Sequence, residues 1–448
     1  MCSRFGTMDG ITVIFILWCV ATQPATASLS CRTEDGQPVD WFVLYKLPPT
    51  TTGKATDGRA YVYRTSVSTQ GDDGSTWIFS QQSIDSAASL PGQTLEPIYN
   101  FPEHVVSEDN DVDERLLLMY NDEFPNGTSS EIAAHAKGVV AFDGQSGFWL
   151  VHSAKGVVAF DGQSGFWLVH SVPRFPPAPG GDRSPETRTN YSYPATGLRY
   201  GQTMLCVSLP FNQADLIGEQ LQYYHPFIYH WSVSSSSKEW IQMVPNLVDV
   251  ARGHHVTKPP WSRSVQLFSS NQLSIISFAK ARQFGLDLYG DWITETLKNA
   301  LYVETWTNGQ GHPMPSLCIN RTLTVENVKQ VHLIDGQVFP SHSDHSKWAI
   351  SSRQEDPWVC VADINRMDSQ RHRGGGSLCF RHTKLWRGFD RAVSQLEACP
   401  LSFDQAINRT VSQLEACPLS FDQAINRKLR KFKKINKKKP IQLHNNVG

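Results

Sequence analysis

The sequence predicts a mixed fold of strands and helices, α/β or α+β, built around mixed sheets. Short apolar stretches bounded by turn residues recur along the chain, as at Trp41–Tyr45 and Leu116–Tyr120. A longer stretch, Ser274–Leu301, has spaced apolar residues and good helix formers, which indicate one or two helices. Both parts of the chain also repeat a similar local plan around a His-x-Lys triplet, and this combination favours a mixed architecture.

Further strands are expected between and after these segments. A hairpin is predicted from strands Gly138–Phe142 and Phe148–His152, joined by a turn at Asp143–Gly147. Tyr200–Pro210 and Leu301–Trp306 also have strand character. A Pro-, Gly- and Ser-rich stretch at 173–194 is expected to be a surface loop.

The N-terminus has the pattern of a secretory signal peptide. The apolar run Ile11–Ala21 precedes a small-residue cleavage site at Ala25–Ala27, so residues 1–27 are expected to be removed. That run is too short to span a bilayer and no later stretch is longer, so no stable membrane insertion is expected. Four glycosylation sequons agree with entry into the secretory pathway. They begin at Asn126, Asn190, Asn320 and Asn408.

Two tandem duplications interrupt the chain, both with an offset of 18 positions. Ala136–Ser153 recurs as Ala154–Ser171, and Val393–Arg409 recurs as Val411–Arg427. Identical pairs differ from old structural repeats, whose copies diverge and are more numerous. A recent tandem event and an error in the assembled gene sequence both remain open.

The cysteine count agrees with an oxidising compartment. Of nine cysteines, two lie in the signal peptide, which leaves an odd number, seven. Because Cys417 copies Cys399 through the second duplication, removing one copy leaves six cysteines, enough for three disulfides.

Charge is distributed unevenly along the chain. Lys428–Lys439 carries eight basic residues, and subtracting eight from the formal net charge of −1 leaves −9 for the rest. The body before Lys428 carries all of this −9 and holds fourteen of the fifteen histidines, whose protonation would bring it to about +5. Such a body attracts polyanions only in acid. For the basic run, a DNA-holding tail and a solvated tail without a specific role are both open.

Two His-x-Lys triplets, His135–Lys137 and His345–Lys347, are the candidate catalytic groups. Residues two apart in a strand project from the same face, so each triplet places an imidazole beside an ammonium. A small polar residue follows each triplet at similar range, Ser153 in the first and Asn365 in the second.

Such a set suits a single phosphodiester. One neutral imidazole attacks phosphorus while the other, as an imidazolium, protonates the leaving oxygen. Lysines and polar donors offset the charge on the non-bridging oxygens, so neither a metal nor a cofactor is expected. A third triplet, His382–Lys384, lacks a polar partner at matching range and is expected to be non-catalytic. His254 and His255 lack further ligands at metal-binding spacing.

A set of stretches that includes both triplets resembles the deoxyribonuclease II family of the phospholipase D superfamily. The stretches are GQPVDWFVLYKLP (36–48), LEPIY (95–99), LLLMYND (116–122), HAKG (135–138), GFWLVHSVP (165–173), YGQTMLCVSLPF (200–211), GHHV (253–256), FGLDLYGDW (284–292), DHSKW (344–348) and PWVCVADINR (357–366) with RGGGSLC (373–379). The match covers most of Cys31 to Cys399 in order. It implies two half-domains in a pseudo-twofold unit, and a metal-independent, lysosomal acid endonuclease that cuts DNA to 3′-phosphate ends.

The resemblance also implies roles for individual residues. His135 corresponds to the nucleophile, which forms a phosphohistidine, and His345 to the general acid. Lys137 and Lys347 accompany them, with Asn365 as the polar partner of the second half. In the first half, Ser153 and Ser171 are alternative partners. Three disulfides are implied: Cys31–Cys206, Cys318–Cys399 and Cys360–Cys379.

The first duplication affects the predicted active site. Only His135 stands two residues before a lysine, whereas the Val172-Pro173 that the family pattern requires follows only the second copy. Catalysis is therefore assigned to the first triplet, with a second hairpin inserted beside it. An insertion in a sheet is tolerated less well than one in a loop, so activity of the chain as written stays open.

The predicted organisation is an N-terminal half at 28–235, a C-terminal half at 236–409 and a duplicated, basic tail at 410–448. DNA is the expected partner, and the oligomeric state is open, a homodimer included. Two alternative functions remain: a catalytically impaired, secreted DNA-binding or toxin-like relative, and a phosphodiesterase that acts on another substrate.

Overall fold

The computed structural model describes residues 29–50, 57–68, 77–99, 116–122, 138–143, 148–152, 155–161, 164–179, 190–233, 238–309, 311–318, 322–334 and 336–399. The predicted signal peptide and the tail at 410–448 lie outside these residues. So do three of the four sequons, whereas Asn190 is described and exposed.

The N-terminal half of the chain forms a ten-stranded sheet. Its strands are β3 (Trp41–Lys46), β4 (Tyr61–Thr65), β5 (Ile78–Phe79), β6 (Leu116–Tyr120), β7 (Gly138–Asp143), β8 (Phe148–His152), β9 (Lys155–Asp161), β10 (Ser164–His170), β11 (Gln202–Pro210) and β12 (Ile228–Val233). They lie in the order β12-β6-β7-β9-β8-β10-β11-β3-β4-β5. A separate pair joins β1 (Cys31–Arg32) to β2 (Pro38–Val39).

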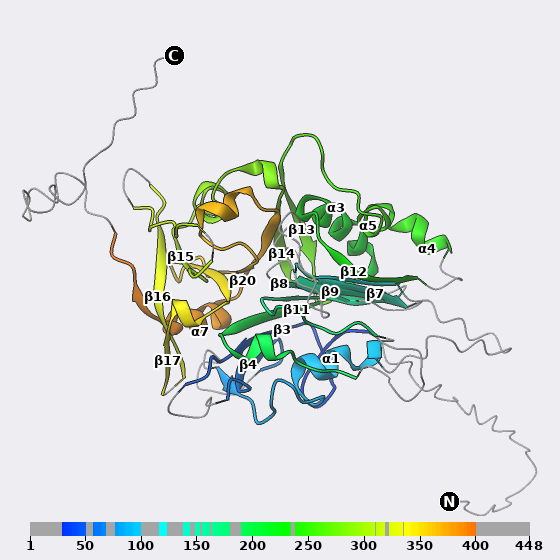
Figure 1. Ribbon diagram of the computed structural model, residues 1–448, viewed down its shortest axis with the longest axis horizontal. Helices are drawn as coiled ribbons and strands as arrows, with labels where there is room; N and C mark the ends of the chain where they lie inside the picture. The colour runs from blue at the N-terminus through cyan, green and yellow to red at the C-terminus, as the bar shows by residue number, and fades with distance from the viewer. Residues whose placement is uncertain are drawn as a thin grey trace, which may run out of the picture.

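The C-terminal half forms a nine-stranded sheet. Its strands are β13 (Ser262–Phe268), β14 (Ser274–Lys280), β15 (Leu301–Thr305), β16 (Val325–Ile334), β17 (Gln337–Pro340), β18 (Lys347–Ser351), β19 (Trp358–Ala362), β20 (Gly375–Arg381) and β21 (Val393–Leu396). The order is β13-β14-β20-β19-β18-β15-β16-β17, with β21 paired to β16. Both sheets mix parallel and antiparallel pairs, and Figure 1 shows them side by side.

Short helices flank the sheets. The α-helices are α1 (Leu90–Tyr99), α2 (Ala195–Leu198), α3 (Ala214–Tyr224), α4 (Lys238–Met243), α5 (Pro245–Ala251), α6 (Thr294–Leu297) and α7 (Thr383–Ala392). Four short 3₁₀-helices are described, η1 (Phe211–Gln213), η2 (Arg282–Phe284), η4 (Ser341–Ser343) and η5 (Asp368–His372), and η3 (Tyr289–Ile293) is a π-helical turn. None of the helices in the described part of the chain combines the length and hydropathy needed to cross a bilayer.

One hydrophobic core spans both sheets. The ring of Trp41 on β3 lies 6.2 Å from that of Phe380 on β20. Trp77 packs edge-on against Phe389 of α7, with centroids 5.1 Å apart, and donates a hydrogen bond to the carbonyl of Gly388. Burial of these large aromatic side chains makes the contact between the halves part of the folded core.

Three disulfides complete the framework, and they are the pairs that the resemblance implied: Cys31–Cys206, Cys318–Cys399 and Cys360–Cys379. Cys360 and Cys379 lie directly opposite each other on β19 and β20, with Cα atoms 4.0 Å apart. The first copy of the second duplication therefore supplies the paired cysteine, Cys399.

Most predicted strands are confirmed, and the helical prediction at Ser274–Leu301 is confirmed only after its first part, where η2 (Arg282–Phe284), η3 (Tyr289–Ile293) and α6 (Thr294–Leu297) form. Strands occur at Trp41–Lys46, Leu116–Tyr120, Gln202–Pro210 and Leu301–Thr305, and the described residues of 173–194 contain no helix or strand before α2. In Ser274–Leu301, the first seven residues form β14 instead. Pairing on both sides, with β13 and β20, outweighs the local preference of this segment for helix.

The predicted hairpin is also wrong in its pairing. Strands form at Gly138–Asp143 and Phe148–His152 as expected, but β9 of the second copy lies between them. β6 pairs with β12 along one edge, so its other edge has room for a single strand. β7 and β9 take the same register there, with Leu117 opposite Ala141 or Ala159, and therefore compete for one position. Identical copies offer β6 the same partner twice, which explains the change.

Candidate active site

The structure describes four of the predicted site residues and leaves three outside. His345, Lys347, Asn365 and Ser171 are described and buried. His135, Lys137 and Ser153 lie outside the described residues. The described part of the site consists of the second triplet and the strand ends that contact it.

A backbone clamp between the two sheets holds the turn that carries His345. The turn begins in η4 and ends where β18 starts. The amide of Gly201 donates to the carbonyl of Ser343 over 2.9 Å, and the amide of His345 donates to the carbonyl of Gly201 over 2.9 Å. A Cβ at Gly201 would lie 2.4 Å from Oδ1 of Asp344, so this close approach requires glycine.

The imidazole of His345 is oriented by groups of the N-terminal half. Its Nδ1 lies 2.9 Å from the carbonyl oxygen of Ser171 and 3.3 Å from Oε1 of Gln202. A carbonyl oxygen only accepts, so Nδ1 carries the hydrogen and donates it. The ring of Trp306 lies edge-on, with its centroid 4.6 Å away. This geometry leaves Nε2 as the nitrogen for proton or phosphoryl chemistry.

Ser171 takes part through both its backbone and its side chain. Its hydroxyl donates to Oε1 of Gln202 and accepts from the amide of Thr203 over 3.1 Å. This second-copy serine, at the end of β10, therefore fixes the carbonyl that receives His345. Sequence reasoning named Ser171 as an alternative polar partner and did not identify Gln202, although Gln202 lies in the YGQTMLC stretch.

Lys347 lies in a buried, acidic environment. Its Nζ donates to the carbonyl oxygen of His345 over 2.5 Å. Burial raises the pKa of Glu304 well above its usual range, and the charge of Asp344 adds to the rise while that of Lys347 opposes it. Burial also raises the pKa of Asp344 itself. The ammonium thus opposes the rise that burial causes in the pKa of both carboxyl groups.

Asp344 connects the triplet to the first sheet. Tyr45 of β3 donates its hydroxyl hydrogen to Oδ2 of Asp344, and the Ser346 hydroxyl donates to the same oxygen over 2.6 Å. Trp348 in turn donates to the Tyr45 hydroxyl over 3.2 Å. These bonds fix the backbone on both sides of His345, and sequence reasoning missed them because Tyr45 is 299 positions away.

Asn365 lies at the same edge of the second sheet as the triplet. β18 begins at Lys347, β19 ends at Ala362, and Trp348 is opposite Val361 in the antiparallel ladder. Asn365 follows that strand end, is 1% exposed, and its Oδ1 has no hydrogen-bond partner among the described residues. The buried pair Arg366–Asp287, at 3.1 Å, anchors the next residue.

The third triplet has a structural role. His382 is the N-cap of α7, and its Nδ1 accepts a hydrogen bond from the amide of Leu385 over 3.1 Å. Lys384 is exposed. His254 bonds Asp249 and His255 stacks on His225 at 3.7 Å, and no group of three or more candidate metal ligands occurs within the described ranges.

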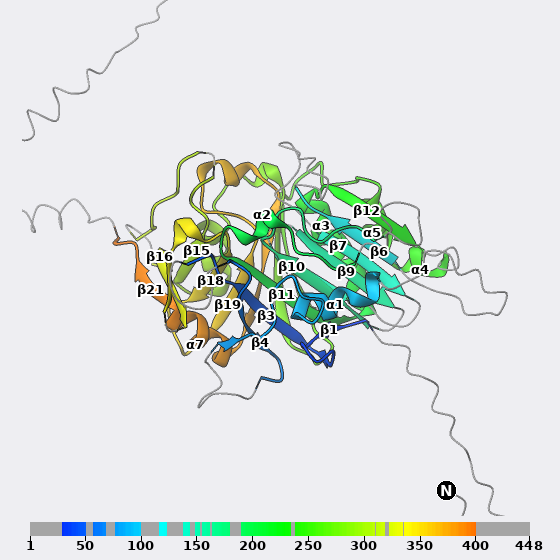
Figure 2. The ribbon, with the colours of Figure 1, turned by 60° about the horizontal axis from the view of Figure 1, so that its bottom comes forward.

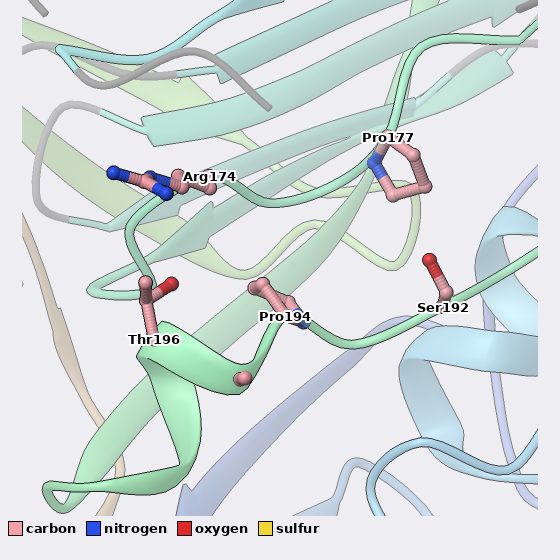
Figure 3. Close-up of a pocket in the computed structure, with 6 residues that line it drawn as sticks. Arg174, Pro177, Ser192, Pro194 and Thr196 are labelled. Carbon is pink, nitrogen blue, oxygen red and sulfur yellow. The ribbon is translucent and has the colours of Figure 1, made fainter. Parts of the chain in front are cut away.

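Two pockets flank α2. One, of about 390 Å³, shares Ser343 with the turn that carries His345 and also includes Arg199, Tyr200 and His342 in its lining. The other, of about 300 Å³, is shown in Figure 3 with Arg174, Pro194 and Thr196 around it. In Figure 2, α2 lies where the strands of the two sheets meet.

Comparisons with known proteins agree on one family. A family model described as Deoxyribonuclease II matches residues 30–154 and 153–399, two ranges that meet at the junction of the first duplication. Deoxyribonuclease-2-alpha of Rattus norvegicus is 37% identical over 383 residues, 84% of this chain and 96% of the relative. Plancitoxin-1 of Acanthaster planci is 36% identical over 377 residues (83% and 93%), and Deoxyribonuclease-2-beta of Homo sapiens is 30% identical over 376 residues (83% and 92%).

Proposed function

The chain belongs to the deoxyribonuclease II family of endonucleases, and from this premise we propose a metal-independent acid endonuclease that cuts DNA to 3′-phosphate ends. Two phospholipase D-like half-domains form its single active site, and the two large sheets support this division. All strands of the first sheet lie within residues 41–233, and those of the second within residues 262–396.

The reaction is assigned to two histidines. Nε2 of His135 attacks phosphorus to form a phosphohistidine, and the 5′ oxygen leaves with a proton from His345. Water then attacks the phosphohistidine and releases the 3′-phosphate. Lys137, Lys347 and Asn365 offset charge on the non-bridging oxygens, as preorganised donors do in such sites.

The orientation of His345 is the observation that carries this assignment. A general acid must present one nitrogen toward the leaving oxygen while the other is held. The Ser171 carbonyl holds Nδ1, so Nε2 carries the transferable proton in the imidazolium form. Oε1 of Gln202 also accepts from Nδ1 and further favours the imidazolium form.

The test is plasmid cleavage at pH 5 in excess EDTA, with the full chain and a chain shortened by one copy. Deleting Ala136–Ser153 or Ala154–Ser171 gives the same polypeptide, in which His135-Ala-Lys continues directly to a single hairpin before Val172. Cleavage by both chains supports the proposal and an extruded extra hairpin. Cleavage by the short chain alone assigns the activity to the single-copy fold and leaves the full chain as an impaired, DNA-binding relative. If neither folded chain cuts, the enzyme assignment fails.

Entry into the secretory pathway and delivery to an acidic, lysosomal compartment belong to the same proposal. Three disulfides and the exposed Asn190 sequon support an oxidising route. Acid conditions also suit the fourteen histidines of the acidic body, since their protonation favours contact with DNA.

A further inference from the structure

We propose that the pocket beside His345 is a stacking subsite for the nucleotide next to the scissile phosphate, with Tyr200 as its aromatic platform and Arg199 as its phosphate-binding group. The subsite rests on the proposed nuclease function. It adds a sequence-tolerant contact, since every base has a face that stacks on an aromatic ring.

A continuous row of ring contacts leads from this pocket to the catalytic histidine. The Arg199 guanidinium lies 5.1 Å from the centroid of the Tyr200 ring. The ring centroids of Tyr200 and Trp306 are 5.7 Å apart, and those of Trp306 and His345 are 4.6 Å apart. Because the last contact is with the imidazole itself, the row places an aromatic surface within one nucleotide of the reacting phosphate.

The pocket is shaped and charged for a nucleotide. Its volume of about 390 Å³ falls within the range of small-ligand sites. None of the described residues that line it is acidic; Arg199 carries a positive charge there, and Tyr200, Asn308 and His342 are polar. Arg199 is exposed and forms no ion pair with a described residue, so its charge is available to a phosphate.

The segment that carries Tyr200 is held rigidly. Lys46 of β3 donates from Nζ to the carbonyl of Leu198 over 2.9 Å, just before Arg199. The next residue after Tyr200 is Gly201, which makes the two backbone hydrogen bonds to the turn that carries His345. Asn308, which also lines the pocket, donates to the carbonyl of His342 over 2.6 Å. A platform fixed on both sides loses little entropy when a base stacks on it.

The first experiment compares the full-length wild type with Tyr200→Leu and Arg199→Ala on duplex DNA at pH 5 in EDTA. For Tyr200→Leu we expect kcat/KM to fall roughly 5- to 100-fold, as for loss of one base–aromatic stack, mainly through KM. Arg199→Ala should weaken binding and reduce its dependence on salt. Arg252→Ala, which removes an exposed arginine outside both pockets, is the control and should behave as wild type.

A second measurement separates stacking from a general structural effect. Cleavage is mapped on a duplex that contains one abasic position, and rates at the adjacent phosphates are compared with rates elsewhere. The wild type should disfavour those phosphates, Tyr200→Leu should lose that discrimination, and Tyr200→Phe should restore it. Unchanged kinetics in Tyr200→Leu, or a slower variant that still discriminates, would overturn the subsite.

Failure of the nuclease function gives a different result. If the wild-type chain cuts no DNA, affinity for a fluorescent single-stranded oligonucleotide replaces cleavage as the measurement. Weaker binding by Tyr200→Leu and not by Arg252→Ala then supports the subsite without the enzyme. Equal binding by all three chains refutes it.

Discussion

The chain carries two described His-x-Lys triplets, His345–Lys347 and His382–Lys384, with the same spacing and different surroundings. In the first, Nδ1 of the histidine donates to a carbonyl of the other sheet, and the lysine is buried beside carboxyl groups. In the second, Nδ1 accepts from the start of a helix, and the lysine is exposed. The hydrogen-bonding roles of the two histidines are opposite.

The charged groups around the two histidines also differ. Burial lowers the pKa of His382, and the cations Arg64 and Lys384 lower it further. Around the first triplet, by contrast, Asp344 and Glu304 supply carboxyl groups. The spacing alone therefore carries no catalytic meaning, and the chemistry depends on what the fold places next to the imidazole.

The largest expected difference between the triplets concerns activity. His345→Asn should lower kcat on DNA at pH 5 by about 10²–10⁴-fold, because it removes the transferable proton. His382→Asn should leave activity unchanged, since asparagine also caps helices. A His345→Asn variant that retains near wild-type activity would contradict the assignment; unfolding curves for both variants verify that they fold.

Substitution of the lysines should give the next largest difference. Lys347→Met removes a cation that offsets charge in the transition state, and we expect kcat to fall about 10²–10³-fold. Lys384→Met changes an exposed side chain and serves as the matched control. Single-turnover cleavage separates this effect from substrate binding, and equal rates in the two variants would remove Lys347 from the mechanism.

A smaller effect is expected when the orienting group of His345 gains a charge. Gln202→Glu places a carboxylate 3.3 Å from Nδ1, if it keeps the position of Oε1. An adjacent anion stabilises the imidazolium, so the alkaline limb of the pH–activity profile should move upward by ~1 pH unit. Movement of the acid limb instead would make His345 the nucleophile and reverse the two roles. No comparable shift is expected from Gln266→Glu, a change on the exposed face of β13.

The smallest effect concerns the helix cap. Because burial lowers the pKa of His382 in the folded state, its cap contributes stability above the unfolded-state value of about 6.5. That contribution is lost as pH falls through the folded-state pKa. His382→Ala should therefore cost about 1 kcal/mol at pH 8 and less at pH 5, as measured by urea unfolding. An equal cost at both pH values would show that the neutral ring is not required.

Prediction from sequence succeeded where the signal was local. Trp41–Lys46 and Gln202–Pro210 form strands because their apolar runs end at turn residues. It failed at Ser274–Lys280, where β13 and β20 on either side decide the conformation. It failed again at the duplicated hairpin, because identical strands have identical pairing preferences and only their connections distinguish them.

The sequence by itself determined the family, the six cysteines of the three disulfides and the candidate His345 and Lys347. These follow from residue identity and order, which need no knowledge of distant contacts. Only the tertiary structure decided that Ser171 and Gln202 hold His345, that Asp344 bonds Tyr45, and that His382 caps a helix. Each of these contacts, except the cap, joins residues more than a hundred positions apart, and such pairing depends on how the two sheets pack.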